Sequence, residues 1–293
     1  MSAAVRRGLE LVPLPGGVGS EILGIDLHST GTLDAAWSRE DTDRLRVELD
    51  RTHMLVWRGS PLSGEEQLAF TGRFGPLLAE RQPWGHVSNV RPDGIVREGA
   101  LLHHSDFAFT PWPVWVICLN ALEVPDDGAP TTFADAVRAA RALPAALRAR
   151  LRDAEVLNVY DFATPQSRRM RVATSDPRAP RCTVPVLGRH PRTGEEVIVA
   201  NEMHSDAIVG LPPAESEAVL ADLFAVLYDP AHLVEHRWQV GDVVLWDNVA
   251  LHHGRPDFPV EQARTLRRVV VGPYTPSELV PDLPELIAAA RGA

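Results

Sequence analysis

The sequence predicts a mainly β protein with flanking helices, an α+β fold with a double-sheet core of the sandwich or jelly-roll type. Short apolar runs recur along the chain between turn residues, and a few longer segments have helical periodicity. The 25 prolines are scattered, which suits strands and loops better than long helices. Many short strands with helices outside them are typical of two packed sheets.

The first third of the chain alternates between expected strands and helices. Leu9–Leu14 and Glu21–Leu27 are two short strands on either side of a glycine pair, and His53–Trp57 is a buried one. Arg39–Thr52 is expected to be helical, because apolar residues recur among its charges. Its apolar positions are Leu45, Val47 and Leu49.

The next helix has clear signals at both ends. Ser63 is an expected N-cap, and Glu66 follows at the spacing of a capping box. The helix is expected over Ser63–Phe74, because Gly75 and Pro76 form a stop followed by a breaker.

The remaining two thirds are rich in strands, and the whole of 1–293 is predicted to be one domain. Two further helices are expected, Phe133–Leu151 with an interruption at Pro144, and Pro213–Tyr228. Residues 158–182 have no period and are expected to form a long loop or lid. The expected strands are Val87–Val90, Leu101–Phe109, Val114–Leu122, Cys182–Leu187, Glu196–Ala200, Val234–Gln239, Asp242–Asp247 and Leu266–Gly272.

Composition excludes several classes of protein. The net charge of −10 argues against nucleic acid or an anionic membrane surface as a partner, since binding phosphate requires surplus cations. Cys118 and Cys182 are too few and too far apart for a disulfide framework. No stretch approaches the roughly 18 apolar residues that span a bilayer. A cytoplasmic location is therefore expected.

Two histidine-containing segments could bind a metal ion. In an extended strand, His104 and Asp106 would share a face and His103 would point to the other. A third ligand would have to come from elsewhere, and His252-His253 follows another expected strand. Two histidines and one carboxylate are the facial ligands of non-haem Fe(II) oxygenases. The His-x-Asp pattern alone, however, is more often a surface pair or a satisfied hydrogen bond.

Five motifs along nearly the whole chain strengthen the metal hypothesis. They are Gly24–Leu27 (GIDL), His53–Gly59 (HMLVWRG), Phe70–Gly75 (FTGRFG), Gly128–Thr131 (GAPT) and Gly241–Asn248 (GDVVLWDN). With them the chain resembles the taurine dioxygenase family of Fe(II)/2-oxoglutarate-dependent dioxygenases. That family also includes the 2,4-dichlorophenoxyacetate and phenoxypropionate dioxygenases. The resemblance implies a double-stranded β-helix as the form of the jelly-roll core.

The resemblance also implies roles for named residues. His104, Asp106 and His253 would ligate Fe(II), and Arg264 and Thr131 would bind the distal carboxylate of 2-oxoglutarate. A guanidinium suits this task because its fork matches a carboxylate. The implied reaction consumes O₂ and hydroxylates, cleaves or desaturates a small organic substrate, with release of succinate and CO₂.

The substrate is less well defined. The residues expected to contact it are Arg268, Asn89, Phe107, His204 and Trp84. Arg268 and three arginines of the expected lid favour an anionic small molecule; the latter are Arg168, Arg169 and Arg171. Trp246 is expected in the core rather than in the pocket.

Two other functions stay open at this stage. One is a metal-dependent enzyme that is not an oxygenase, similar to a cupin isomerase, which would not need Arg264 and Thr131. The other is a catalytically silent family member that binds 2-oxoglutarate. The oligomeric state also stays open, since family members are often dimers or tetramers.

Overall fold

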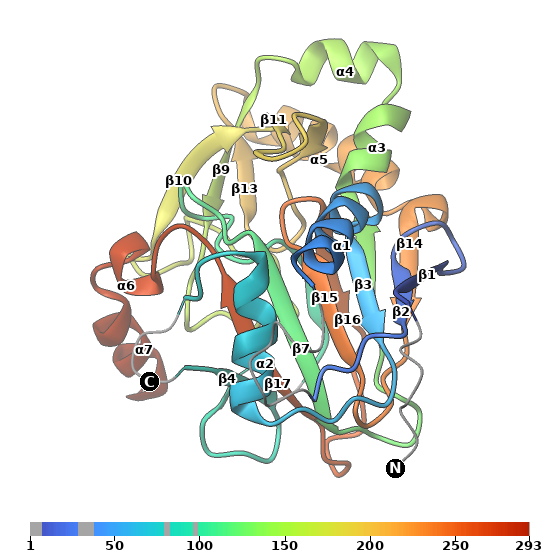
Figure 1. Cartoon of the computed structure of the whole chain (residues 1–293). Helices are drawn as coiled ribbons and strands as arrows, with labels where there is room; N and C mark the ends of the chain where they lie inside the picture. The colour runs from blue at the N-terminus through green and yellow to red at the C-terminus, as the bar shows by residue number, and fades with distance from the viewer. Residues whose placement is uncertain (1–7, 29–37, 79–82, 96–98, 293) are drawn as a thin grey trace, which may run out of the picture.

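The computed structural model describes residues 8–28, 38–78, 83–95 and 99–292 (Figure 1). An eight-stranded sheet has the order β1-β2-β3-β15-β7-β17-β4-β5, and a four-stranded sheet has the order β14-β8-β16-β6. The strands of the larger sheet are β1 Glu10–Pro13, β2 Ser20–Leu23, β3 Met54–Trp57, β4 Gly85–Ser88, β5 Gly94–Ile95, β7 Val116–Glu123, β15 Val243–Asp247 and β17 Thr265–Val271. Those of the smaller sheet are β6 Leu101–His104, β8 Thr131–Asp135, β14 Leu233–His236 and β16 Leu251–Arg255.

The two sheets pack face to face, and the strand period decides which side chains lie between them. In β15, Val244 and Trp246 join Phe133 and Leu251 of the smaller sheet in one buried cluster. Leu245, between the first two, belongs to a cluster on the outer face of the large sheet. This alternation is that of a strand buried on both faces. The predicted mainly β core with helices outside it is confirmed.

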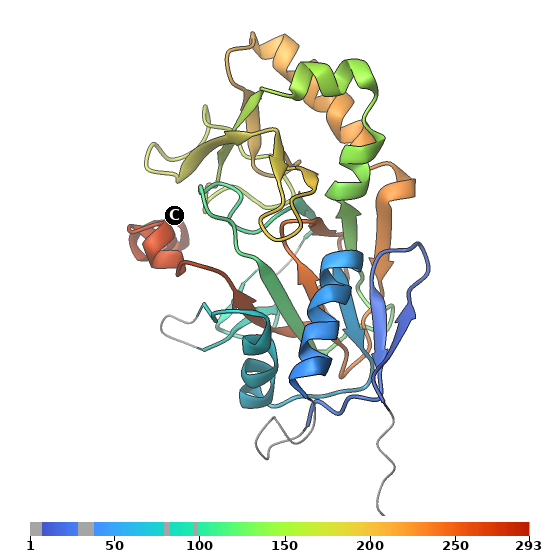
Figure 2. The same cartoon turned by 45° about the horizontal axis from the view of Figure 1, so that its top comes forward.

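The helices cover the sheets from two sides (Figures 1 and 2). α1 Arg39–Thr52 and α2 Gly64–Thr71 lie on the outer face of the large sheet, where Leu45, Leu49 and Phe70 are buried. The predicted bounds of α1 are confirmed, but Val47 is 68% exposed and does not join its apolar face. The helices at the other end are α3 Ala136–Ala142, α4 Ala145–Leu151 and α5 Pro213–Leu227.

The capping box of α2 forms as predicted. The Ser63 hydroxyl accepts a hydrogen bond from the Glu66 backbone N–H, and the Glu66 carboxylate accepts one from the Ser63 N–H. The helix ends at Thr71, and a short 3₁₀ turn, Gly72–Phe74, completes the expected range.

We expect Ser63→Ala to lower the free energy of unfolding by about 1 kcal/mol, because the N-terminal N–H groups of α2 lose their acceptor. Urea denaturation monitored by circular dichroism measures this change. Ser63→Asp keeps a capping oxygen and should stay close to wild type. A similar loss in both variants would contradict capping as the cause.

The predicted helix over 133–151 is wrong at its start. Residues 131–135 form β8, in the middle of the smaller sheet, and the helix begins only at Ala136. Asp135 is the reason for this boundary, because its carboxylate accepts hydrogen bonds from the N–H groups of Val137 and Arg138. The predicted interruption at Pro144 is confirmed.

Other elements also differ from the sequence prediction. Leu101–Phe109 is a strand only as far as His104. The expected loop 158–182 is framed by two paired strands, β9 Glu155–Val159 and β10 Arg181–Pro185, and only the residues between them lack helix or strand. Further elements that were not predicted are β5, β13 Ser205–Ile208, β16, α6 Pro276–Leu279 and α7 Leu283–Gly292. The expected strands Cys182–Leu187 and Glu196–Ala200 are found as β10 and as β12 Glu196–Ile198, and β12 forms a hairpin with the additional strand β11 Leu187–Arg189.

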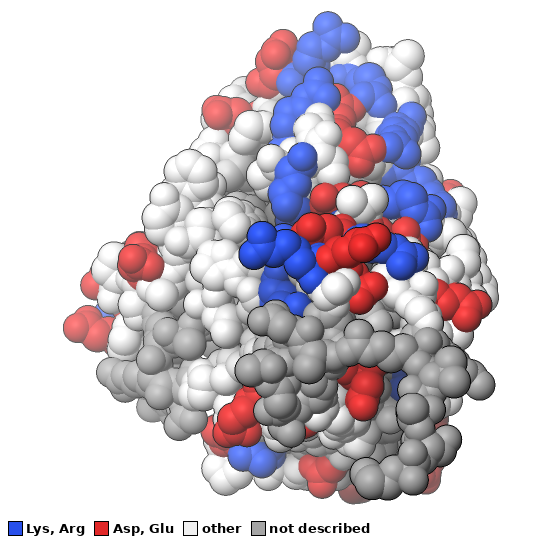
Figure 3. Space-filling model, in the orientation of Figure 1, with Lys and Arg blue, Asp and Glu red and all other residues white. Residues whose placement is uncertain are grey.

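On one face of the molecule, basic and acidic side chains lie close to one another in the upper part of the view (Figure 3). Around α3 and α4, blue and red side chains alternate, and the ion pairs there are Arg141–Glu195, Arg148–Glu196 and Arg150–Glu215. Among the described residues, no helix has both the length and the apolar character that crossing a membrane demands.

Candidate active site

Two histidines face each other across neighbouring strands of the smaller sheet. β16 pairs antiparallel with β6, and in this register His253 lies directly opposite His104. The centroids of the two imidazole rings are 4.3 Å apart. Both residues are buried, with 7% of His104 and 8% of His253 exposed. Strand pairing, rather than sequence proximity, therefore brings the two rings together.

Asp106 reaches the same point from a turn that follows β6, and not from the strand that the sequence predicted. Phe107 has a φ of 61°, so the chain reverses at this turn. Asn248 holds the turn with both ends of its amide: its Oδ1 accepts from the Asp106 N–H at 2.9 Å, and its Nδ2 donates to the Asp106 carbonyl at 3.1 Å. Ser105 donates to the Asn248 carbonyl at 2.6 Å.

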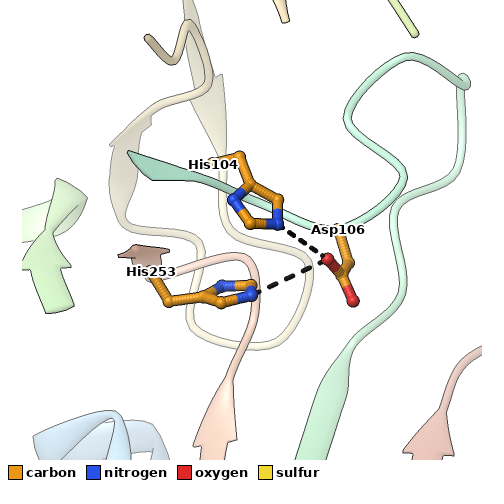
Figure 4. A group of neighbouring side chains, drawn as sticks. All are labelled: His104, Asp106 and His253. Carbon is orange, nitrogen blue, oxygen red and sulfur yellow. Dashed lines mark hydrogen bonds and ion pairs between the residues drawn. The ribbon is translucent and has the colours of Figure 1, made fainter. Parts of the chain in front are cut away.

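The three side chains converge on one point (Figure 4). Asp106 Oδ1 lies 3.1 Å from His104 Nε2 and 3.7 Å from His253 Nε2. One ligand atom from each residue falls within 4.8 Å of the others. Neighbouring ligands about 2.1 Å from a metal ion are about 3 Å apart, so these spacings fit a shared ion.

The protonation of these groups also fits a metal site. His104 Nδ1 lies 2.9 Å from the Leu102 carbonyl, to which it can only donate, so Nε2 is the ring nitrogen that is placed to bind a metal ion. Burial, and then the neighbouring His104, hold the pKa of His253 well below its usual value. Burial opposes ionisation of Asp106, but Arg268 and the two imidazoles outweigh it and hold the pKa of Asp106 well below its usual range. The site thus offers two imidazole nitrogens and one carboxylate as ligands.

The triad opens into a cavity of about 80 Å³ between the two sheets. Thr131 lines it from β8 of the smaller sheet, and Arg264 and Arg268 line it from β17 and the residue before that strand. Its other lining residues are largely apolar: Val87, Ile95, Leu101, Ile117, Leu119, Trp246, Gly254, Arg255 and Leu266. The cavity combines the triad with a buried cation and a hydroxyl group.

Arg264 is an unusual cation for a protein interior. Only 3% of it is exposed, and its Nε has no hydrogen-bond partner among the described residues. Burial, and to a smaller extent the nearby Arg255, lower the pKa of Arg264 to about 9. A buried guanidinium without a carboxylate is unfavourable, so this side of the cavity is suited to an anionic ligand.

Arg268 contacts the triad directly. Its Nη2 lies 2.5 Å from Asp106 Oδ2, the carboxylate oxygen that faces away from His253. Arg268 lines the same cavity as Arg264. It is therefore placed to contact both the triad and a ligand next to it.

The other residues that were expected to contact a substrate lie in different places. His204 is 1% exposed, and its ring packs edge-on against His104 with centroids 5.5 Å apart. Phe107 stacks on Phe109 beside it. Trp84 instead packs over Gly64 of α2 and near Arg267. None of the three expected lid arginines lines the cavity.

The Asn89 side chain supports Arg264 rather than lining the cavity. Its Oδ1 accepts from the Arg264 N–H at 2.8 Å, and its Nδ2 donates to two carbonyls of the 260–262 segment. Arg169 and Arg171 are bound to Glu217 of α5, and Arg168 is exposed. A substrate contact of Asn89 or Trp84 stays a prediction, and the lid arginines lend no support to an anionic substrate.

Sequence reasoning missed three supporting residues. Asn248, described above, holds the turn of Asp106. Asp247 accepts hydrogen bonds from the N–H groups of Val249 and Ala250 and from His190 Nε2, so it holds the turn that leads into β16. Trp246 is buried as predicted, yet it also lines the cavity. The Trp-Asp-Asn motif was the available signal for all three.

Comparisons with known proteins agree with this site. The family model described as "Taurine catabolism dioxygenase TauD, TfdA family" matches residues 10–270. The chain is 31% identical over 281 residues to an (S)-phenoxypropionate/alpha-ketoglutarate-dioxygenase of Sphingobium herbicidovorans, covering 88% of this chain and 92% of that protein. It is 32% identical over 248 residues to an alpha-ketoglutarate-dependent 2,4-dichlorophenoxyacetate dioxygenase of Cupriavidus pinatubonensis, covering 75% and 84%.

A solved structure gives the same result for the fold. A taurine dioxygenase from Burkholderia xenovorans superposes with a TM-score of 0.75 and 25% sequence identity, over 91% of each chain. The predicted double-stranded β-helix, or jelly-roll, core is thereby confirmed. The chain belongs to the TauD/TfdA family of alpha-ketoglutarate-dependent dioxygenases.

Proposed function

We propose that this enzyme is an Fe(II)- and 2-oxoglutarate-dependent dioxygenase that hydroxylates, or oxidatively cleaves or desaturates, a small anionic organic molecule. The observation that carries the proposal is the single cavity that joins the His104–Asp106–His253 triad to the buried Arg264 and Thr131. A cupin-like metal enzyme without a keto acid would have no use for a buried guanidinium at this place.

Side chains that line the cavity would bind the metal ion and 2-oxoglutarate. His104 Nε2, the Asp106 carboxylate and His253 Nε2 would bind the metal ion, and Arg264 and Thr131 would bind the distal carboxylate of 2-oxoglutarate. When bound, Fe(II) together with 2-oxoglutarate and O₂ supplies an oxidant that replaces a C–H hydrogen by hydroxyl, with release of succinate and CO₂. The apolar walls of the cavity, such as Ile117 and Leu119, exclude water from this chemistry.

The anionic nature of the substrate rests on Arg268. This residue lies beside the triad, where an anion could share its guanidinium with Asp106. Two relatives are named for phenoxypropionate and 2,4-dichlorophenoxyacetate, which are both carboxylates. The proposed binding partner is thus a small-molecule substrate rather than a nucleic acid or a membrane.

Two measurements test the proposal. First, an anaerobic titration with Fe(II) and then 2-oxoglutarate should produce the weak visible charge-transfer band of a chelated keto acid. Second, O₂-dependent succinate formation should be measured with aryloxyalkanoic acids, sulfonates and amino acids, each against its neutral ester or amide. We expect the acids to exceed their neutral partners by about 100-fold, the value of one charge-assisted pair.

Each alternative has its own outcome. Bound iron without the band would favour a metal enzyme that is not an oxygenase. A band without turnover over the whole panel would favour a silent binding protein. Turnover of the neutral compounds alone would leave the dioxygenase assignment intact and show that the substrate is not anionic.

A further inference from the structure

The hydroxyl group of Thr131 has a fixed partner on the side away from the metal triad. Trp238 Nε1 donates a hydrogen bond to Thr131 Oγ1 at 3.0 Å. Both residues are buried, with 2% of Trp238 and 5% of Thr131 exposed. The bond therefore lies in a dry interior, where a hydrogen bond is strong and well directed.

The loop after β14 holds Trp238 in this position from two directions. The backbone N–H of Trp238 donates to the Gly128 carbonyl at 3.1 Å, and Gly128 has a φ of +81°. A Cβ atom at Gly128 would lie 3.2 Å from the Trp238 carbonyl oxygen, so the absence of a side chain permits this close approach. Gly128 and Thr131 lie only three residues apart, so the backbone bond to Gly128 also holds the Trp238 indole close to Thr131.

Asp242 fixes the other end of the loop. Its buried Oδ2 accepts from the Gln239 N–H at 2.9 Å and lies 3.1 Å from His236 Nε2. Arg58 forms an ion pair with the same oxygen. His236 in turn packs edge-on against the Trp238 indole, with centroids 4.6 Å apart. The indole is thus oriented by the chain on both sides, independently of any ligand.

This contact determines what the Thr131 hydroxyl can do. A hydroxyl has one proton to donate and accepts through its lone pairs. Because the indole N–H cannot accept, it occupies an acceptor direction of Oγ1 and leaves the proton free to donate elsewhere. Thr131 lines the cavity with Arg264, so that proton is available to a carboxylate bound there.

We propose that Trp238 is a positioning residue for 2-oxoglutarate: its indole N–H orients the Thr131 hydroxyl as a donor toward the distal carboxylate of the cosubstrate. This inference rests on the proposed function, and it adds a residue outside the cavity wall to the cosubstrate site. Two other buried tryptophans differ in this respect, because the indole nitrogens of Trp246 and Trp57 have no hydrogen-bond partners among the described residues.

The test compares Trp238→Phe with Trp57→Phe. Each variant removes the same atoms from a buried tryptophan, and Trp57 lies on the outer side of the large sheet, against Phe70. The dissociation constant for 2-oxoglutarate is measured anaerobically from the charge-transfer band of the Fe(II) protein. We expect Trp238→Phe to raise this constant about tenfold and Trp57→Phe to leave it unchanged.

Two comparisons separate positioning from general damage. With 2-oxopentanoate, which has a methyl group in place of the distal carboxylate, Trp238→Phe should have no effect. In a double-mutant cycle, Trp238→Phe should add nothing to Thr131→Val, because the indole acts only through the hydroxyl. Equal losses with both keto acids, or additive losses in the cycle, would overturn the inference.

A third measurement leaves Trp238 in place, in case its replacement prevents folding. In the protein with Zn(II) in place of iron, Thr131→Val should speed hydrogen exchange of the Trp238 indole N–H, as seen by NMR. Unchanged exchange would overturn the inference. If wild type gives no charge-transfer band, the proposed function fails; if the band forms and Trp238→Phe binds 2-oxoglutarate like wild type, only this inference fails.

Discussion

Asp106→Ala should weaken metal binding strongly and abolish turnover. The substitution removes the only carboxylate of the triad and leaves two imidazoles next to Arg268, whose partner oxygen is lost. A cation would then enter a site with a net positive charge. Residues that merely support metal ligands contribute 10–100-fold to affinity, so we expect Fe(II) binding to weaken by at least about 100-fold. Anaerobic equilibrium dialysis measures the affinity, and succinate formation measures the turnover.

Two further variants show which part of the loss comes from charge. Asp222→Ala, on the exposed side of α5, removes a carboxylate of the same kind and should behave like wild type. Asp106→Ala combined with Arg268→Met should regain part of the metal affinity, because the unpaired cation is gone. If Asp106→Ala alone binds Fe(II) as tightly as wild type, the triad assignment is wrong.

The sequence predicted best those elements whose signals are local. α1 has a helical apolar pattern and is found at its expected bounds, and the Ser63 capping box lies within four residues. Val47 shows the weakness of pattern alone, because its position in the helix faces solvent. Capping residues and apolar periodicity thus predict the bounds of a helix reliably. They predict less reliably which of its residues are buried.

Elements set by long-range pairing were harder to predict. Thr131–Asp135 leads directly into an alanine-rich helix. The Asp135 cap marks the start of that helix, but pairing with β14 and β16 makes the residues before it a strand. The same holds for β16, whose Leu-His-His-Gly-Arg sequence has no strand period. These two strands carry Thr131 and His253. Both residues were therefore assigned to the site from the resemblance to a known family, and not from a predicted strand arrangement.

The convergence of the triad was predicted for a reason that the structure corrects. His104 and Asp106 meet because a turn follows β6, and the turn is held by Asn248, which lies 142 residues further along the chain from Asp106. The sequence of residues 103–106 alone does not predict the hydrogen bonds between Asn248 and the backbone of Asp106. The Trp-Asp-Asn motif therefore acts structurally on both sides of the site: Asp247 holds the turn before β16, and Asn248 holds the turn of Asp106.

Arg264→Met should have opposite effects on stability and on cosubstrate binding. The pKa of Arg264 is lowered to about 9, first by burial and then by Arg255, so the folded protein disfavours its charge by roughly a few kcal/mol. This penalty is complete below pH 9 and disappears as the pH rises from about 9 to above 12, because the folded state releases the proton first. Methionine fills a similar space without a charge.

We therefore expect the metal-free Arg264→Met protein to unfold at a temperature several degrees above wild type at pH 7. In the same variant the dissociation constant for 2-oxoglutarate should rise by at least about 100-fold, because a charge-assisted pair with the distal carboxylate is lost. Thermal unfolding followed by circular dichroism and the anaerobic charge-transfer titration give the two values.

Arg267→Met is the matched control for this trade-off. Arg267 is also buried, but its guanidinium donates to Gln67 Oε1 at 2.7 Å and to Asn120 Oδ1 at 3.0 Å. Removing it leaves these acceptors unsatisfied, so Arg267→Met should lower the unfolding temperature and leave the affinity for 2-oxoglutarate near wild type. If both variants lose stability equally, the charge of Arg264 is already compensated in the free protein. The free cavity would then contain no uncompensated positive charge for a carboxylate to pair with. The free energy of binding 2-oxoglutarate would have to come from the metal site alone.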